Sequence, residues 1–207
     1  MRLEALTVVS GEPVWRAYAV RADDYIELLG SIEATAPEDQ HLIARWAAGI
    51  NGLILDVGCG PGHWTHFLHG AGARVVGIDP VDRFLDSARQ RYPGVPFRTG
   101  SASDLGEEDG TVAGVLAWYS LIHTPPEQLS GVFSALAGAL RPGGSALLGF
   151  FEGPELVAFD HTVTVAWTWP VPELARWLAQ AGLAVAETHT RTDPGQRAHG
   201  AVVATLP

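Results

Sequence analysis

The sequence has a single cysteine, few basic residues and no long apolar run, and each shortage excludes a class of protein. Cys59 has no second cysteine with which to form an internal disulfide, so the chain fits a reducing, cytoplasmic setting. Arginine and lysine total 13 against 23 acidic residues, which gives a net charge of −10, and no basic cluster offsets this acidity locally. Nucleic acid is therefore not an expected partner, since binding phosphates requires such clusters. The same acidity argues weakly against an anionic substrate.

No run of about 18 apolar residues is present, so we expect no membrane-spanning helix. The N-terminal stretch lacks the basic start and apolar block of a secretion signal. The longest apolar run, Val112–Trp118, is short and favours a buried strand. With 207 residues, 47% of them hydrophobic, the chain can form one ordinary α/β domain, and we expect a single domain over residues 1–207.

One stretch, from Leu53 to Gly62, reads LILDVGCGPG and combines an apolar run, an acid and three glycines. A segment typical of a helix, PGHWTHFLHGAG, follows at once. Glycine permits backbone angles that side chains resist, and it lets a ligand lie directly against the main chain at the start of a helix. This stretch therefore predicts a nucleotide-like cofactor site.

Strands and helices alternate through the middle of the chain. The pattern predicts a helix over Pro37–Ala48, with Thr35 as N-cap, Glu38 completing a capping box and Gly49 at its end. Such alternation indicates parallel strands with helices on both faces of the sheet. The expected strands are Leu53–Val57, Arg74–Asp79, 96–100, 112–119 and 145–151, and the helices between them are 61–69, Asp82–Tyr92 and Glu127–Leu140.

The N-terminal part, residues 1–36, is interpreted as a loose lead followed by a lid helix that begins at Glu12. Aromatic residues including Trp15, Tyr18 and Tyr25 recur at helical spacing along it. This aromatic face either packs on the domain or meets the cofactor through Tyr18 or Tyr25.

The last third changes character. Residues 152–171 show no helical period and are interpreted as a variable segment that covers the acceptor. A helix is expected at 172–181. Two alternating strands, 183–191 and 199–206, are joined by the short turn TDPGQR, so they must form an antiparallel hairpin.

The order of these motifs resembles that of class I S-adenosylmethionine-dependent methyltransferases over roughly residues 37 to 205. The resemblance rests on the glycine loop with its preceding Asp56, on Asp79 in GIDP, on Asp104 in SASDL, and on the LRPGG turn followed by the closing hairpin. It implies a Rossmann-like, doubly wound α/β fold with a mostly parallel seven-stranded sheet and an antiparallel C-terminal hairpin strand. It also implies S-adenosylmethionine as cofactor and S-adenosylhomocysteine as product.

The resemblance assigns roles to particular residues. Asp79 is placed on the ribose hydroxyls, which a bidentate carboxylate suits, and Asp104 on the adenine amino group, with Pro80 and Leu105 as apolar plates. Asp56 either organises the loop or meets the cationic methionyl end. The full expected cofactor set is Tyr25, Asp56, Gly58, Cys59, Gly60, Gly62, Asp79, Pro80, Ser103, Asp104, Leu105, Trp118 and Tyr119.

A nicotinamide dinucleotide enzyme is the competing interpretation of the glycine loop, since it also has glycines after a strand and an acid further on. That pattern requires a third glycine where this chain has His63. Asp104 and the closing hairpin also belong to the methyltransferase pattern, which we therefore favour.

His123, just after the fourth strand, is the first candidate general base, because its reference pKa of about 6.5 suits neutral conditions. Capping of the next helix is its alternative role. His161 is a second candidate base. Tyr18, Trp167 and Trp169 are candidates for the acceptor pocket, with packing in the core as the alternative for the two tryptophans.

His63, His66 and His69 recur at steps of three, but no carboxylate or cysteine set accompanies them, so no metal is expected. The expected function is methyl transfer to an O or N atom, less readily a C atom, of a small organic molecule, with a homodimer as a possible assembly. The alternative is a protein of the same fold that retains the cofactor for non-methyl chemistry, such as a cyclisation, or only for binding.

Overall fold

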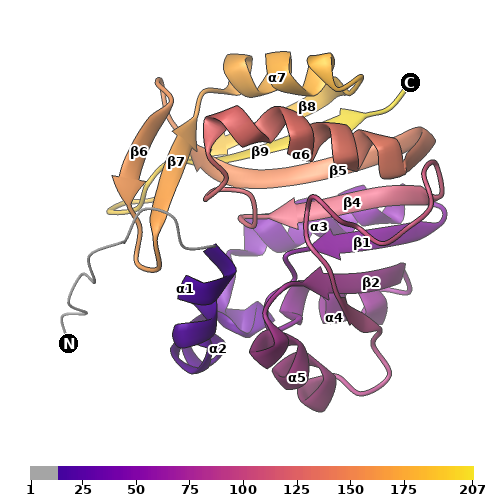
Figure 1. The fold of residues 1–207 in the computed structure, drawn as a ribbon, viewed down its shortest axis with the longest axis vertical. Helices are drawn as coiled ribbons and strands as arrows, with labels where there is room; N and C mark the ends of the chain where they lie inside the picture. The colour runs from indigo at the N-terminus through magenta and orange to yellow at the C-terminus, as the bar shows by residue number, and fades with distance from the viewer. Residues whose placement is uncertain (1–13) are drawn as a thin grey trace.

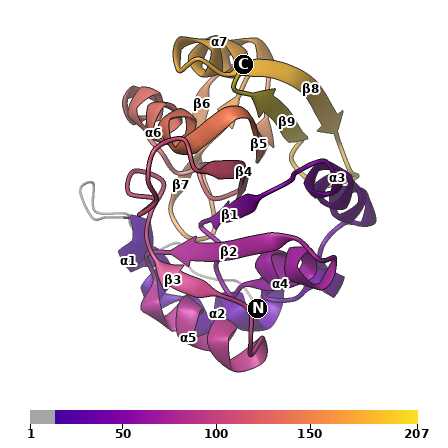
Figure 2. The same ribbon diagram turned by 90° about the vertical axis from the view of Figure 1, so that its right-hand side faces the viewer.

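The computed structural model describes residues 14–207, so the expected N-terminal lead and the start of the lid helix at Glu12 lie outside the described residues. A twisted mixed sheet forms the centre of the molecule, with helices on both sides (Figures 1 and 2). The parallel strands are β3 (Phe97–Thr99), β2 (Arg74–Asp79), β1 (Leu53–Val57), β4 (Val112–Trp118) and β5 (Leu140–Glu152), in that spatial order. The expected α/β fold with a mostly parallel sheet is confirmed.

The C-terminal hairpin closes one edge of the sheet. Strand β9 (His199–Thr205) runs antiparallel to β5, and β8 (Ala184–Arg191) runs antiparallel to β9. This is the antiparallel hairpin expected from the short TDPGQR turn. Because β5 and β9 pair from Ser145–Thr205 to Phe151–His199, the turn between β8 and β9 lies at the carboxyl end of β5.

The sheet has nine strands, not seven, because the segment 152–171 forms a hairpin of its own. Strand β7 (Val165–Trp169) pairs in parallel with Phe151 and Glu152, on the side of β5 that becomes free where β4 ends. Strand β6 (Val157–Asp160) pairs with β7 in antiparallel fashion. The hairpin therefore extends the sheet beyond the carboxyl ends of the inner strands.

Alternate residues of the inner strands pack on opposite faces of the sheet, as the two-residue period of a strand requires. Leu55 and Leu148 face α6 (Pro126–Ala139) and α7 (Val171–Gln180), whereas Ile54 and Leu147 face α3 (Pro37–Ala48) and α4 (His63–Gly70). Figure 2 shows these two helix pairs on opposite sides of the sheet. Helix α5 (Asp82–Arg91) packs against β2 and β3.

The N-terminal segment forms two short helices, not one. Helix α1 (Val14–Val20) ends at Arg21, and α2 (Ala22–Leu29) follows, with a short 3₁₀ turn at Ile32–Ala34. Both helices contact α5. In Figure 1, α1 and the β6–β7 hairpin lie toward the carboxyl ends of β1, β2 and β4.

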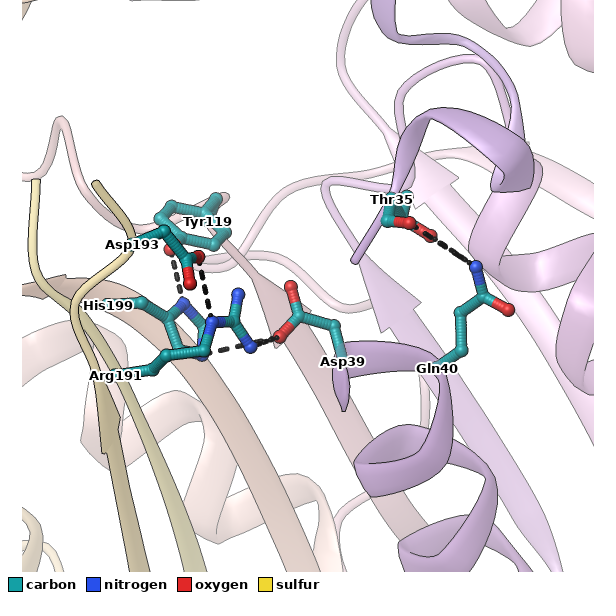
Figure 3. A network of polar contacts seen from close by, with 7 residues as sticks. All are labelled: Thr35, Asp39, Gln40, Tyr119, Arg191, Asp193 and His199. Atoms are coloured by element: carbon teal, nitrogen blue, oxygen red, sulfur yellow. Dashed lines mark hydrogen bonds and ion pairs between the residues drawn. The ribbon is translucent and has the colours of Figure 1, made fainter. Parts of the chain in front are cut away.

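The predicted capping box at α3 is wrong. Ala36 occupies the N-cap position and Pro37 begins the helix, which leaves Thr35 one residue too early to cap it. The Thr35 hydroxyl instead donates to the carbonyl of Ile32. It also accepts a hydrogen bond of 3.1 Å from the Gln40 amide, which Figure 3 shows. Proline at the first helical position needs no N–H partner, so it begins the helix without a side-chain cap.

Candidate functional site

A cavity of about 830 Å³ lies at the carboxyl edge of the parallel strands. Residues that follow β1, β2 and β4 line its floor, and residues of α1, α2 and α5 line its other side. This is the edge at which open parallel sheets bind ligands. The cavity therefore coincides with the place that the sequence predicts for the cofactor.

Asp79, at the end of β2, is the one acidic side chain among the described residues that line this cavity. Its Oδ2 accepts a hydrogen bond of 2.9 Å from the Gly60 amide, and its Oδ1 accepts one of 2.8 Å from the Val81 amide. Burial raises the pKa of Asp79 to about 6, although the two amide hydrogen bonds lower it. Each carboxylate oxygen can accept more than one hydrogen bond, so Asp79 can still receive a pair of hydroxyl donors.

The glycines of the loop after β1 differ in what they face. Gly58 and Gly60 line the cavity, and a Cβ added at Gly60 would meet only the Tyr25 ring edge, at 3.9 Å. Gly62 does not line it, because a Cβ there would meet the Phe97 ring at 2.6 Å and Ala88 at 2.9 Å. The backbone at Gly60 is thus open to a ligand, whereas Gly62 permits close packing of the loop on its neighbours.

Asp56 lies beneath this loop and not in the cavity. It is 2% exposed, and it accepts a hydrogen bond of 2.6 Å from the Thr65 hydroxyl of α4. Burial raises the pKa of Asp56 to about 7, against the effect of the Thr65 hydrogen bond. Of the two expected roles, this position supports organisation of the loop and not contact with the methionyl end. Cys59 is also buried outside the cavity lining.

Of the residues expected around the adenine ring, some line the cavity and others do not. Pro80 and Ser103 line the cavity, together with Ser101 and Ala102. Asp104 is exposed and its backbone pairs with Ser101 across a tight turn, so its side chain is outside the lining.

Leu105 also departs from its expected role. It directly follows the Ser101–Asp104 turn and is buried in the main core cluster, and not at the cavity wall. The expected apolar plate opposite Pro80 is therefore not formed by Leu105.

Helix α1 and helix α2 bring aromatic side chains to the cavity. Tyr18 and Tyr25 both line it, with ring centroids 5.6 Å apart, and each also contacts the ring of Phe84 from α5. Trp15 lines it as well. This position agrees with the interpretation of the N-terminal helices as a lid. Phe84 belongs to the expected helix Asp82–Tyr92, but nothing in its spacing marks it as a cavity residue.

His123 lines the same cavity and joins two distant segments. Its Nδ1 is 2.7 Å from the Val165 carbonyl of β7, so Nδ1 carries the proton and donates it. Its Nε2 is then the acceptor for the Tyr18 hydroxyl, at 2.8 Å. Burial lowers the pKa of His123 to about 4, so the ring is neutral at pH 7.

A network of polar side chains begins at the hydroxyl of Tyr119, a residue that lines the cavity from the end of β4 (Figure 3). The Tyr119 hydroxyl is hydrogen-bonded to Nδ1 of His199, whose Nε2 is 3.7 Å from Asp39. Asp39 pairs with Arg191 at 2.8 Å, and Arg191 pairs with Asp193 at 2.9 Å. Sequence reasoning missed this network, because its members come from α3, the end of β4 and the C-terminal hairpin.

The remaining candidate residues lie elsewhere. Trp118 lines the cavity. His161 is close to His123, with ring centroids 5.1 Å apart, but it lines a separate cavity. Trp169 is 1% exposed and stacks on Phe150 in the core, and Trp167 is half-buried against the same cluster. The expectation that the two tryptophans wall an acceptor pocket is wrong, because β7 turns them into the core or its margin.

The three histidines of α4 do not converge on one point. His63 is buried, and burial lowers its pKa to about 4, whereas His66 stacks on Tyr92 with centroids 4.2 Å apart. Within residues 14–207, no group of three histidine, cysteine or acidic side chains is arranged to hold a metal ion. No helix in this range is long and apolar enough to cross a membrane.

A family model described as "Methyltransferase domain" matches residues 54–144 of the chain. The chain is 30% identical, over 145 residues, to an uncharacterized methyltransferase of Synechocystis sp., a match that covers 66% of this chain and 68% of that protein. It is 33% identical over 114 residues to a trans-aconitate 2-methyltransferase of Acidovorax ebreus, covering 54% of this chain. The chain spans only 43% of the length of that second relative.

Among solved structures, the fold is similar to that of 1,6-didemethyltoxoflavin-N1-methyltransferase from Burkholderia thailandensis, which was crystallised with 1,6-didemethyltoxoflavin and S-adenosylhomocysteine. The TM-score is 0.74 at 20% sequence identity, and the match covers 97% of this chain and 93% of that one. At this identity the likeness shows a shared fold.

Proposed function

Because this chain belongs to the class I S-adenosylmethionine-dependent methyltransferases, we propose that it transfers the cofactor's methyl group to an oxygen or nitrogen atom of a small organic molecule. The observation that carries this proposal is the covered cavity of about 830 Å³, which has Asp79 on one side and the hydrogen-bonded pair of Tyr18 and His123 on another. Known small-molecule pockets are of this size and are also lined mainly by apolar and aromatic groups.

The residues of the cavity fit the cofactor. S-adenosylmethionine has vicinal ribose hydroxyls, for which Asp79 offers acceptor capacity, and a positive sulfonium, which supplies the activated methyl group. Gly60 leaves the backbone open beside Asp79, and Pro80 and Ser103 are available to the adenine ring. No arginine or lysine side chain among residues 14–207 lines this cavity, so nothing there repels a cationic ligand.

We propose that Tyr18 and His123 remove the acceptor's proton. His123 is neutral, and its Nε2 accepts a hydrogen bond from the Tyr18 hydroxyl. When the Tyr18 oxygen takes the proton of the acceptor, the proton that Tyr18 carried can pass to Nε2. The Val165 carbonyl, which accepts from Nδ1, favours the charged imidazolium while it exists. His161 lines the neighbouring cavity and not this one, so His123 is the proposed base.

Two segments are proposed as the acceptor cover within a single domain. Helix α1 holds Tyr18 over the cavity, and β7 supplies the Val165 carbonyl that fixes the His123 ring. The small-molecule acceptors in the names of the trans-aconitate and didemethyltoxoflavin enzymes agree with a covered site of this size.

The test is S-adenosylhomocysteine formation with a panel of hydroxyl- and amine-bearing small molecules. We expect Tyr18→Phe and His123→Gln to lower kcat by about 100-fold, as loss of general base catalysis commonly does, while the affinity for S-adenosylhomocysteine stays unchanged. Tyr92→Phe is the matched control, since Tyr92 stacks on His66 outside the cavity. Cofactor binding without product across the panel would contradict the proposed function, and unchanged turnover of His123→Gln would remove only the base assignment.

A further inference from the structure

A second cavity, of about 470 Å³, lies beside the first at the carboxyl ends of β4, β5 and the β8–β9 turn. The side chains that matter to its chemistry are those of Tyr119, Phe151, His161, Arg191, Arg197 and His199. Phe151 packs against both Tyr119 and His161, with centroids 4.9 and 5.8 Å apart. An aromatic wall therefore stands next to basic side chains.

Arg197 brings an accessible positive charge to this cavity. Its guanidinium lies over the ring of Phe159, 3.8 Å from the centroid, and no acidic side chain of residues 14–207 forms an ion pair with it. Arg197 and His161 line the same cavity, where burial and then the charge of Arg197 lower the pKa of His161. The cation–π contact fixes the guanidinium while leaving its N–H groups available.

Arg191 is held rigidly in the same wall. Nη1 donates to Asp39 and Nε donates to Asp193, as Figure 3 shows, and no hydrogen bond from Nη2 to a described residue is formed. Asp39 and Asp193 pair with Arg191, and Asp193 also lines the cavity, so Arg197 is the arginine of the lining that has no carboxylate partner among residues 14–207. Arg191 adds a fixed N–H donor that needs no reordering when a ligand binds.

The two cavities share a wall. Tyr119 lines both, and His161 of the second cavity is in ring contact with His123 of the first. The backbone of Tyr119 has φ +56, a conformation that is strained for a residue with a side chain and that is often retained at functional sites. This backbone conformation holds the Tyr119 ring between the two cavities.

We propose that the second cavity binds a carboxylate carried by the methyl acceptor, so that the substrates are small organic acids. This inference rests on the proposed function, and it differs from the expectation, drawn from net charge alone, that argues weakly against an anionic substrate. Arginine is suited to the task, because its planar fork matches the two oxygens of a carboxylate. The acid would lie against Phe151 and Arg197, with the reacting atom on the Tyr119 side toward the first cavity.

The experiment compares acids with their neutral amides. Binding of 4-hydroxybenzoate and 4-hydroxybenzamide, and of indole-3-acetate and indole-3-acetamide, is measured by saturation-transfer NMR and fluorescence titration on protein saturated with S-adenosylhomocysteine, so that no turnover is needed. We expect at least one acid to bind about fivefold more tightly than its amide, and the difference to shrink at high salt.

Arg197→Gln should bring the acid-to-amide ratio of Kd values to about one, because it removes the positive charge that distinguishes an acid from its amide. Arg197 is exposed, so the fold should tolerate the substitution. Arg176→Gln is the matched control, since Arg176 pairs with Glu173 on α7 and lines neither cavity. Equal binding of acids and amides by the unmodified protein, or a preference that survives Arg197→Gln, would overturn the inference. Turnover of neutral acceptors together with equal binding would overturn it while leaving the proposed function intact.

Discussion

Substituting alanine at Gly60 and at Gly62 should separate cofactor binding from stability. Both residues have a positive φ, +54 and +85, so an alanine at either position should cost about 1–2 kcal/mol of folding free energy through backbone strain alone. Their surroundings differ. A Cβ at Gly60 enters the cavity beside Tyr25, whereas a Cβ at Gly62 meets the Phe97 ring and Ala88 at less than normal contact distance.

For Gly62→Ala the strain adds to overpacking. Forcing a methyl group into a filled site commonly costs about 1–3 kcal/mol more, so we expect a total loss of about 2–5 kcal/mol in the free energy of unfolding. The added methyl group does not face the cavity. The affinity of the folded fraction for S-adenosylhomocysteine should therefore stay within about threefold of the unmodified protein, or about 0.7 kcal/mol.

For Gly60→Ala we expect the opposite result, a small loss of stability and a large loss of cofactor affinity. Its loss of stability should be limited to the strain of about 1–2 kcal/mol, while the methyl group occupies space that the cofactor needs next to Asp79. We expect at least a tenfold loss of affinity for S-adenosylhomocysteine, which is about 1.4 kcal/mol. Gly72→Ala is the control, because Gly72 has φ +88 and no heavy atom within 4 Å of an added Cβ.

Urea denaturation gives the stability of the three variants, and isothermal titration calorimetry with S-adenosylhomocysteine gives their affinities. If Gly60→Ala binds S-adenosylhomocysteine as the unmodified protein does, the cofactor does not lie against this part of the backbone. If Gly62→Ala is no less stable than Gly72→Ala, packing on Phe97 and Ala88 is not what requires a glycine there.

Three further substitutions test single carboxylates. Asp79→Asn should weaken S-adenosylhomocysteine binding by about tenfold or more in calorimetry, because an amide replaces one acceptor oxygen with a donor that faces a backbone N–H; unchanged affinity would contradict the assigned site. Because burial raises the pKa of Asp56 to about 7, its contribution to stability is present below about pH 4 and is lost as the pH rises through about 7. Asp56→Asn should therefore reduce the fall in urea-denaturation stability between about pH 5 and about pH 8, and an identical fall in the variant would refute this origin. Asp39→Ala should cost about 3 kcal/mol, since Arg191 and His199 would lose their buried partner; a loss of stability below about 0.5 kcal/mol would show that the network is not a structural tie.

The periodic elements of the fold could be predicted from the sequence, because local pattern determines them. Strands β1 and β2 occur at the expected residues, and the short turn after Arg191 required the antiparallel hairpin. The β6–β7 hairpin was not predicted, since residues 152–171 show no clear period, and β7 joins the sheet only through its pairing with Phe151 and Glu152 at the end of β5.

Within the site, residues at strand ends could be placed and distant pairs could not. Asp79 and Gly60 follow strands, and the topology alone brings them to one edge of the sheet. Leu105 shows the limit of this reasoning. Ser103 lines the cavity while Leu105, two residues later, is buried in the core, and the sequence does not show where in this turn the change occurs. The pairing of Arg191 with Asp39 joins residues 152 positions apart, and no local pattern in the sequence marks either of them.

The two cavities differ in charge, and this difference bears on the reaction. Asp79 is the one charged side chain from residues 14–207 in the lining of the first cavity, which suits a positive sulfonium ligand. In the second cavity, Arg191 is paired with carboxylates and Arg197 has none among the described residues, so the Arg197 guanidinium is the group that suits an acid. The ring of Tyr119 lies between them. An acid held by Arg197 would keep its negative charge away from Asp79 and would present its uncharged, reacting end to the methyl group. Charge would then select which end of the acceptor enters the first cavity, so that the site needs no further polar contact to orient the molecule.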